Sequence, residues 1–209
     1  MNKIVKPKIN NLIDSTFEEY VESEDLCGVC IKENSDSNIS FNNITIDSCK
    51  FINIDFNNIE LSNVSLVDVI FEHCNLSNKV FNKCGIHRVI FKDCKLTGCD
   101  FSFSSSNNIE FIDTTFRYGN LSYAKLKNIN FINCDLTELS LIETKIENLN
   151  FDNCNLTRAD IYNTCMNKVD LSTSNIDNIK VDINSIKGVI VNSYQAISIV
   201  SLLGIEVKD

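Results

Sequence analysis

The sequence has little of what catalytic and membrane-spanning proteins usually need. It contains no tryptophan, one proline, six glycines and two histidines among 209 residues. The glycines are scattered and form no loop of the kind that cradles a phosphate group. His73 and His87 have no nucleophile paired with them in the sequence. No apolar run approaches the length of a membrane span. We therefore expect a protein that is not an enzyme, holds no cofactor or metal and enters no membrane.

Net charge and the first residues add to this expectation. The formal net charge is −9, which disfavours direct binding to the phosphates of a nucleic acid. Lys3, Lys6 and Lys8 are not followed by an apolar segment, so the pattern of a secretory signal is missing. These features predict a cytoplasmic protein that does not itself bind nucleic acid.

A period of five residues organises the sequence from Phe41 to Val191. Of the 31 positions spaced by five in this range, 30 carry a large apolar side chain, and Ser106 is the exception. Residues five apart lie about 140° apart on a helix and on opposite faces of a strand, so neither element would gather them on one face. The chain must instead turn a corner every five residues and coil around a shared interior, as solenoids do.

A second period gives the number of sides. Phenylalanine recurs every twenty residues, at Phe51, Phe71, Phe91, Phe111, Phe131 and Phe151. Twenty residues per coil and five per side predict a four-sided rod whose stacked backbones lie about 4.8 Å apart. At Ser106 we expect the buried hydroxyl to bond to a backbone carbonyl of the adjacent coil.

At many sites asparagine follows the apolar position by two residues, and we consider ten of them. Asparagine tolerates turn geometry and bonds to nearby backbone, so we assign these residues to the corners of the coil. The ten are Asn43, Asn53, Asn58, Asn63, Asn128, Asn133, Asn148, Asn153, Asn163 and Asn178.

Cysteine is abundant, with ten residues, which in a short secreted chain would indicate disulfides. Seven of the ten lie two residues before a ladder position, where a small side chain would point inward. They are Cys49, Cys74, Cys84, Cys94, Cys99, Cys134 and Cys154. We interpret them as buried thiols in a reduced interior, although stacked pairs such as Cys74 and Cys94 would be close enough for a disulfide.

Three repeated units carry a family resemblance. Residues 91–97, 131–137 and 151–157 read FKDCKLT, FINCDLT and FDNCNLT. They resemble the consensus of the pentapeptide-repeat family, which places a small residue two before a central Phe or Leu. The resemblance covers about three quarters of the chain and implies an all-β fold, a right-handed quadrilateral parallel β-helix. The right hand agrees with the general preference of parallel crossovers.

The segments outside the repeat divide the chain into three parts. Residues 1–38 lack the period and carry an acidic run, and we expect them to cap the first coil before the β-helix of residues 39–191. Cys27 and Cys30 form a Cys-x-x-Cys pair, which could be redox-active or half of a zinc site. Because no partner pair and no βαβ pattern accompany it, we favour a cap that contains two cysteines.

Residues 192–209 form the third part, where the five-residue period stops. Their spacing predicts a short helix that is capped at its start by Asn192 or Ser193 and stopped by Gly204, followed by a brief strand at residues 205–207. The run from Tyr194 to Ile205 is similar to the C-terminus of the Qnr and MfpA group, pentapeptide proteins that act on type II topoisomerases. In that group this region joins two rods. The resemblance implies a homodimer formed through Tyr194, Ile197, Val200, Leu202 and Leu203. The alternative is a cap without dimerisation.

Charge differs among the sides of the rod. The side containing Phe51 has a net charge of −4 and that containing Phe41 −3, whereas the side containing Ile46 has +3. The acidic candidates on the Phe51 side are Glu72, Asp93, Glu110 and Asp113. A rod with regularly spaced carboxylates resembles a DNA duplex in width and charge. The resemblance implies a DNA mimic that binds DNA gyrase or topoisomerase IV and alters sensitivity to quinolones.

A candidate contact patch lies on the Phe41 side. Phe103 and Tyr123 occupy equivalent outward positions on successive coils, with Tyr118 close in sequence and Asp100 and Glu143 beside them. Aromatic residues are enriched at protein interfaces, although Phe103 could simply cover the Ser104–Ser106 corner.

Two other functions stay open at this point. The rod could be a scaffold for some other protein, or an immunity factor against a peptide toxin aimed at gyrase. Proteins related to Qnr often carry a protruding loop that matters for protection. The unbroken period predicts that this chain has no such loop.

Overall fold

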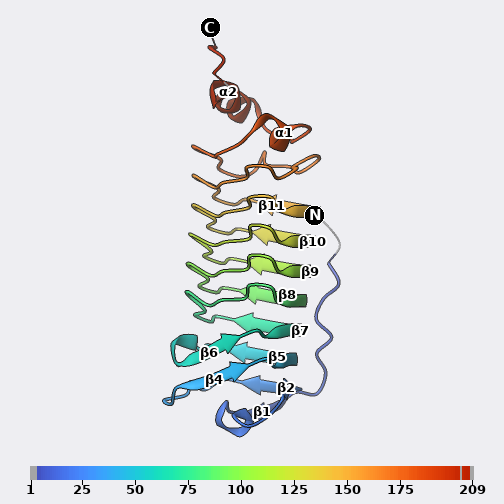
Figure 1. The fold of residues 1–209 in the computed structure, drawn as a ribbon, viewed down its shortest axis with the longest axis vertical. Helices are drawn as coiled ribbons and strands as arrows, with labels where there is room; N and C mark the ends of the chain where they lie inside the picture. Colours follow the sequence, from blue (N-terminus) through green and yellow to red (C-terminus); the bar gives the residue numbers. More distant parts are fainter. Residues whose placement is uncertain (1–3, 203, 208–209) are drawn as a thin grey trace.

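The computed structural model describes residues 4–202 and 204–207, and the chain forms a rod of stacked coils (Figure 1). Six eight-residue strands stack in parallel: β5 (Thr45–Ile52), β7 (Ser65–Glu72), β8 (Gly85–Lys92), β9 (Ser105–Ile112), β10 (Lys125–Ile132) and β11 (Lys145–Asp152). Each residue pairs with the one twenty positions on, so that Phe71 lies between Phe51 and Phe91. The predicted right-handed quadrilateral parallel β-helix is confirmed.

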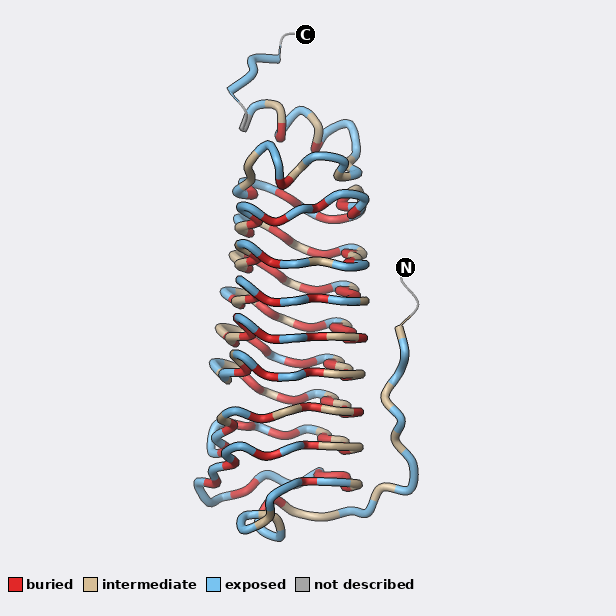
Figure 2. The backbone as a smooth tube through the Cα atoms, turned by 45° about the vertical axis from the view of Figure 1, so that its right-hand side comes forward, coloured by how far each residue is buried: buried red, intermediate tan, exposed pale blue. Residues whose placement is uncertain are grey.

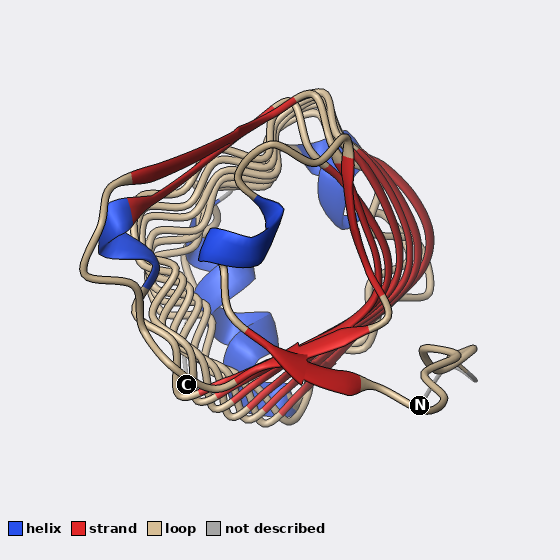
Figure 3. Cartoon of the chain, turned by 90° about the horizontal axis from the view of Figure 1, so that it is seen from below, coloured by secondary structure: helices blue, strands red, loops and turns tan. Residues whose placement is uncertain are grey.

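The four sides are of two kinds, as the view along the rod shows (Figure 3). The strands occupy two neighbouring sides, because each strand bends around one corner. On the other two sides, adjacent coils are joined through isolated bridges such as Asn75 to Lys95 and Val80 to Asp100. Near the N-terminal end, β4 (Ile39–Asn42) pairs with β6 (Ile59–Ser62), which follows the 3₁₀ helix η2 (Phe56–Asn58). We call the two kinds the strand sides and the bridge sides.

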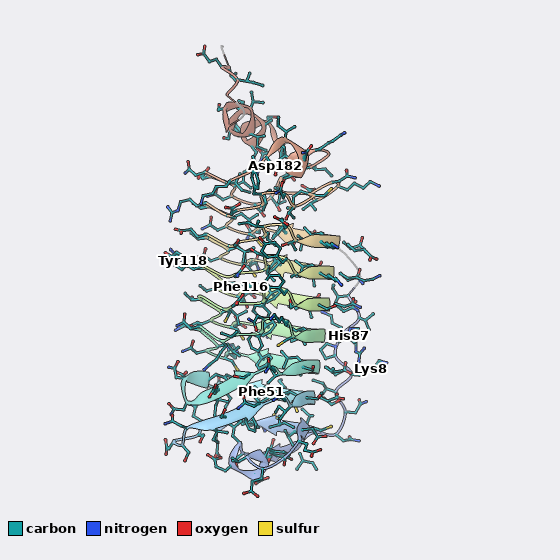
Figure 4. All side chains as sticks on the ribbon, in the orientation of Figure 1. Lys8, Phe51, His87, Phe116, Tyr118 and Asp182 are labelled. Atoms are coloured by element: carbon teal, nitrogen blue, oxygen red, sulfur yellow. The ribbon has the colours of Figure 1, made fainter. Side chains whose placement is uncertain are left out.

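The five-residue ladder fills the interior. Every ladder residue from Phe41 to Leu141 is buried, and four of the later ones are half-buried: Ile146, Val181, Ile186 and Val191. The rings of the phenylalanine column stack face to face, with centroids 4.6 to 5.3 Å apart. Phe51 and Phe116 both lie within the rod (Figure 4). Stacked rings at this spacing bury large apolar area and gain further from offset aromatic contact.

The corners are made by residues in the left-handed backbone conformation. Nine of the ten repeated asparagines have a positive φ, as their assignment to corners predicts. Asn58 is the exception, because it ends helix η2 and so lies in a helical turn. Asparagine also stacks between coils: Asn148 donates from Nδ2 to Oδ1 of Asn128 at 2.9 Å.

The seven inward cysteines are buried free thiols, as predicted. Those at Cys74, Cys94 and Cys134 donate to two backbone carbonyls each, one two residues earlier and one in the preceding coil. Thr114 occupies the same column and makes the same pair of bonds through Oγ1. The column therefore favours small side chains with a donor, which explains why Thr114 can stand among the cysteines.

Ser106 differs from the expectation in its partner. Its side chain is buried, but its Oγ lies 3.2 Å from Oγ of Ser104 and no bond to an adjacent carbonyl is found in the described residues. One of the two inward hydroxyls thus donates to the other. The pairing of β9 with β8 and β10 keeps the twenty-residue register through this point. A cavity of about 10 Å³ lined by Ser106, Phe111 and Leu126 remains beside the serine.

The N-terminal residues contain an additional coil that the period did not reveal. The short elements are β1 (Ile13–Ser15), η1 (Glu18–Tyr20), β2 (Asp25–Cys27) and β3 (Val29–Ile31). Leu26 pairs with Ile46 and Ile31 with Phe51, so the ladder register begins one coil earlier. Phe17 closes the end of the core by stacking on Phe51 at 5.9 Å.

Residues 4–10 lie apart from this end and run back along the outside of the rod (Figures 1 and 2). We call this segment the strap. We expected residues 1–38 to cap the first coil, but the strap instead lies against the strands of later coils. Its side-chain partners come from residues 60 to 104 positions away in the sequence.

The C-terminal end carries two helices. Asp182 caps α1 (Ile183–Ile186) by accepting from the N–H groups of Asn184 and Ser185. Asn192 caps helix α2 (Ser193–Leu202), as predicted: Asn192 and Gln195 exchange side-chain to backbone bonds in a capping box. The helix ends before Gly204, which has a φ of 76°.

The predicted strand at residues 205–207 is wrong. Within the described residues this segment is irregular, and its backbone pairs with no neighbouring strand. A strand of three residues needs a partner edge, and α2 carries the chain past the last coil.

Candidate protein-binding surfaces

The most exposed aromatic pair lies on a bridge side. Phe103 and Tyr123 stack with centroids 4.9 Å apart and planes 9° apart, while 56% and 46% of their surfaces remain exposed. Glu143 occupies the next position of the same column and is exposed. We call Phe103, Tyr123 and Glu143 the aromatic patch. The structure therefore brings together three of the residues that the sequence singled out.

Backbone conformation makes the aromatic residues of this patch unusual. Phe103 and Tyr123 have φ angles of 58° and 62°, at corner positions where asparagine is common in this chain. Bulky residues rarely adopt this conformation, and strain of about 1–3 kcal/mol is usual for such outliers. Stacking recovers part of this energy, but a polar residue would satisfy the corner at less cost.

Tyr118 lies on the neighbouring bridge side. Its ring is 52% exposed, its φ is 55°, and the guanidinium of Arg117 lies 5.7 Å from its centroid. Arg117 also reaches Asp135 at 3.5 Å. Tyr118 projects from the edge of the rod opposite Lys8 and His87 (Figure 4).

Asp100 is less available than the other members of the predicted patch. Its side chain is half-buried, and its Oδ1 accepts the backbone N–H of Ser102 at 2.9 Å. This is the bond of an Asx turn, in which the carboxylate stabilises the corner. Asp160 and Asp170 accept the same bond from the backbone N–H of the residue two positions later.

The four acidic candidates of the Phe51 side have separate surroundings. Asp93 and Asp113 share one column and are exposed, and Asp113 accepts from Nδ2 of Asn133 at 3.0 Å. Glu72 lies between Lys50 and Lys92, at 2.8 and 3.1 Å. Hydrogen bonds from these two ammonium groups lower the pKa of Glu72 to about 2.

Glu110 is not an exposed carboxylate. Only 5% of its surface is accessible, because the strap covers it and Lys6 forms an ion pair with it. Only Asp93 and Asp113 of the four therefore present negative charge without a lysine partner.

The predicted dimer residues lie on the outer face and flank of α2. Tyr194 is 85% exposed and Ile197 51%, whereas Val200 is half-buried. Gln195 and Ile199 are buried and hold the helix on the last coils, where Gln195 Nε2 donates to the carbonyls of Leu171 and Ser174. Leu203 and the side chain of Leu202 lie outside the described residues.

Cys27 and Cys30 are both free thiols, the first exposed and the second buried. Burial raises the pKa of each thiol, which opposes the thiolate form that redox chemistry needs. Within residues 4–202 and 204–207, no three His, Cys, Asp or Glu side chains gather as a metal site would require. In the same part of the chain, every helix is too short or too polar to cross a membrane.

The strap is the feature that sequence reasoning missed. Its contacts depend on Asp68, Asn108 and Glu110, and nothing in the five-residue period marks these residues as partners of the N-terminal segment. The burial of these three polar side chains became visible only in the structure.

The chain is similar to known repeat proteins in sequence and in structure. A model of the pentapeptide repeat region matches residues 64–131, and a model of eight pentapeptide repeats matches residues 39–78 and 134–172. No curated protein sequence matches the chain.

Similar solved structures include two of repeat proteins with described roles. Trypsin-treated QnrB1, a plasmid-mediated fluoroquinolone resistance protein, is 24% identical, with 88% of this chain and 97% of that chain covered and a TM-score of 0.43. HetL from Nostoc sp. strain PCC 7120, involved in heterocyst differentiation regulation, is 12% identical, with 81% and 90% covered and a TM-score of 0.40. The repeat models together span residues 39–131 and 134–172, and with the twenty-residue register they show that the chain belongs to the pentapeptide-repeat family.

Proposed function

We propose that this protein binds a type II topoisomerase, DNA gyrase or topoisomerase IV, as a non-enzymatic DNA mimic and so modulates quinolone sensitivity. Such a partner would place it in the cytoplasm. The observation that carries the proposal is the aromatic patch. Stacked exposed rings stand where the fold favours asparagine, and a carboxylate lies in the same column. Exposed residues that cost stability at a corner are candidates for contact with a partner.

Negative charge supports the proposal. The net charge of −9 favours approach to a groove lined with Lys and Arg. Asp93 and Asp113 on successive coils repeat at the spacing of the backbone, about 4.8 Å. Nothing protrudes from the coils between residues 39 and 191, all of which are described. We therefore expect inhibition of the enzyme to be the main effect.

We further propose that two rods associate through α2. Its outer face exposes Tyr194 and Ile197, and exposed apolar groups on a short terminal helix favour an interface. Light scattering should give twice the chain mass of 23.6 kDa. Tyr194→Asp with Ile197→Asp should give the monomer mass with unchanged circular dichroism. A monomer mass before mutation would show that α2 only covers the end of the rod.

Supercoiling by purified gyrase tests the topoisomerase proposal. The wild-type protein should inhibit the reaction, and Phe103→Asn with Tyr123→Asn should weaken inhibition at least tenfold. Ile13→Asn, which changes an exposed apolar residue at the other end of the rod, is the matched control and should inhibit like wild type. Absence of inhibition by the wild-type protein would favour the scaffold function, and capture of other partners would then identify it.

A further inference from the structure

The strap is held on a strand side by polar contacts. The backbone N–H of Val5 donates to Oδ1 of Asn108 at 3.1 Å, and the N–H of Lys8 donates to Oδ1 of Asp68 at 2.8 Å. The side chain of Lys6 pairs with Glu110. The strap runs beside the strands along the rod (Figure 1), and Lys8 and His87 project from that edge (Figure 4).

The spacing of these contacts matches both the distance between coils and the length of an extended chain. Asp68 and Asn108 belong to one column and lie two coils apart, a distance of about 9.6 Å at about 4.8 Å per coil. Lys8 and Val5 are three residues apart, which an extended chain spans in about 10 Å. An extended peptide that runs along the rod can therefore donate one N–H to every second coil. The match depends on backbone geometry and not on the side chains of the strap.

The charges beside the strap fit a lysine-bearing peptide. Asp68 is 5% exposed and its carboxylate also accepts Nε and Nη2 of Arg88, both at 2.5 Å. Arg88 therefore neutralises Asp68 and leaves its oxygen as an acceptor for backbone. Glu110 has only the amine of Lys6 opposite it among the salt bridges of the described residues. A peptide without a cation at this position would leave a buried carboxylate unpaired, which is costly.

The apolar side chains of the strap are only partly buried. Val5 is 51% exposed and the side chain of Lys6 60%, while Ile4, Pro7 and Ile9 are half-buried. Its attachment combines two backbone donors and one amine with these half-buried side chains. Contacts of this kind are favourable when the segment that makes them is tethered to the rod. Another chain that offers the same groups can replace them.

We propose that the wall formed by Asp68, Arg88, Asn108 and Glu110 is a binding surface for an extended, lysine-bearing segment of a partner protein, and that the strap is its tethered occupant. We call it the strap wall. Such a partner must displace residues 4–10, so the strap lowers the apparent affinity of the partner for the wall. The carboxylate of Glu110, whose ion-pair partner Lys6 leaves with the strap, disfavours a phosphate-rich ligand. The inference is independent of the topoisomerase proposal, because the strap wall and the aromatic patch lie on different sides.

The test uses the full chain and a release variant, Val5→Pro with Lys6→Glu, which removes one N–H donor and reverses the paired charge. Hydrogen exchange should show the Lys8 amide protected in wild type and at least tenfold faster in the release variant. The ligand is a synthetic peptide with the sequence of residues 4–10, followed by the side-chain amide signals of Asn108 in NMR titrations. A peptide with glutamate at both lysine positions is the control.

We expect the peptide to bind the release variant at least tenfold more tightly than wild type. Adding Glu110→Gln to the release variant should weaken binding at least fivefold, whereas adding Asp113→Asn, three residues away and outside the strap wall, should not. Shifts confined to other residues, equal binding to wild type and variant, or equal binding of the glutamate peptide would overturn the proposal. An Lys8 amide that stays protected in the release variant would also overturn it, because other contacts would then hold the strap.

Discussion

The strap wall and the aromatic patch share one twenty-residue register, but the first is covered by the chain and the second is exposed. On the strand side, the outward column carries Asp68, Arg88 and Asn108, and the chain covers it with its own N-terminal segment. On the bridge side, the outward column carries Phe103 and Tyr123, and these rings remain exposed. The interior is the same behind both. The comparison shows that the repeat determines where an outward side chain stands but leaves its chemistry free.

The largest effect should come from the interior that both surfaces share. Phe111 is 3% exposed and stacks between Phe91 and Phe131 at 5.0 and 4.6 Å. Phe111→Ala should lower the free energy of unfolding by about 3–5 kcal/mol, because stacked coils cannot collapse into the void. Urea denaturation followed by circular dichroism measures it. Phe103→Ala is the matched exposed ring, and a loss as large there would contradict the assignment of the two columns.

A smaller effect concerns charge on the strand sides. The folded pKa of Glu72, about 2, lies below its ordinary value of 4.5 because Lys50 and Lys92 bond to it. Ionised Glu72 therefore stabilises the fold above pH 4.5, and this contribution fades as the pH falls from 4.5 towards 2. Since both lysines are partly exposed, Glu72→Gln should cost only about 1 kcal/mol at pH 7.

The difference between wild type and Glu72→Gln should disappear near pH 2 in urea titrations at several pH values. With Lys50→Met and Lys92→Met already present, the same substitution should have no such pH-dependent cost. An equal cost at pH 7 and pH 2 would show that packing, and not the ion pairs, is responsible.

Replacing the aromatic patch should sharpen the comparison by separating stability from binding. Phe103→Asn with Tyr123→Asn removes two bulky residues from positive φ but also removes their stacking. We expect the double variant to be as stable as wild type or more stable by about 1 kcal/mol. Thermal unfolding checks this. A large loss of stability would mean that the rings support the corner and would remove the argument for a contact role.

The smallest effect should come from Ser106→Leu. Leu66, Ile86 and Leu126 occupy the same column in other coils, so the backbone accommodates a larger side chain there, and a cavity of about 10 Å³ is already present. Loss of the bond to Ser104 opposes the gain. We expect the free energy of unfolding to change by about 1 kcal/mol or less in either direction. The double variant Ser104→Ala with Ser106→Leu should be more stable than the single variant Ser106→Leu. Unfolding of the single variant at room temperature would contradict this.

Much of the fold could be predicted from the sequence because the interior repeats. A ladder at every fifth residue and phenylalanine at every twentieth determine the number of sides, and the inward cysteines follow from the same count. The extra coil at Leu26 and Ile31 was missed because residues 32–38 depart from the five-residue ladder. The strap could not be predicted, since two of its contacts use backbone donors, which any sequence possesses, and reach residues 60 and 103 positions away.

The candidate site was predictable only in part. The equivalence of Phe103 and Tyr123 followed from register, and their stacking confirms the common column. Whether each carboxylate is exposed, paired with a lysine or buried did not follow from register. Lys50 and Lys92 neutralise Glu72, and the strap buries Glu110. Both depend on where long lysine side chains reach, which the repeat leaves undetermined.

Binding of purified gyrase to the immobilised protein, measured with and without the aromatic patch, tests the central claim most directly. We predict saturable binding by wild type that weakens as salt rises, and at least tenfold weaker binding by Phe103→Asn with Tyr123→Asn at unchanged thermal stability. Equal binding by the two proteins would contradict the role assigned to the patch. No binding by wild type at any salt concentration would contradict the topoisomerase proposal itself.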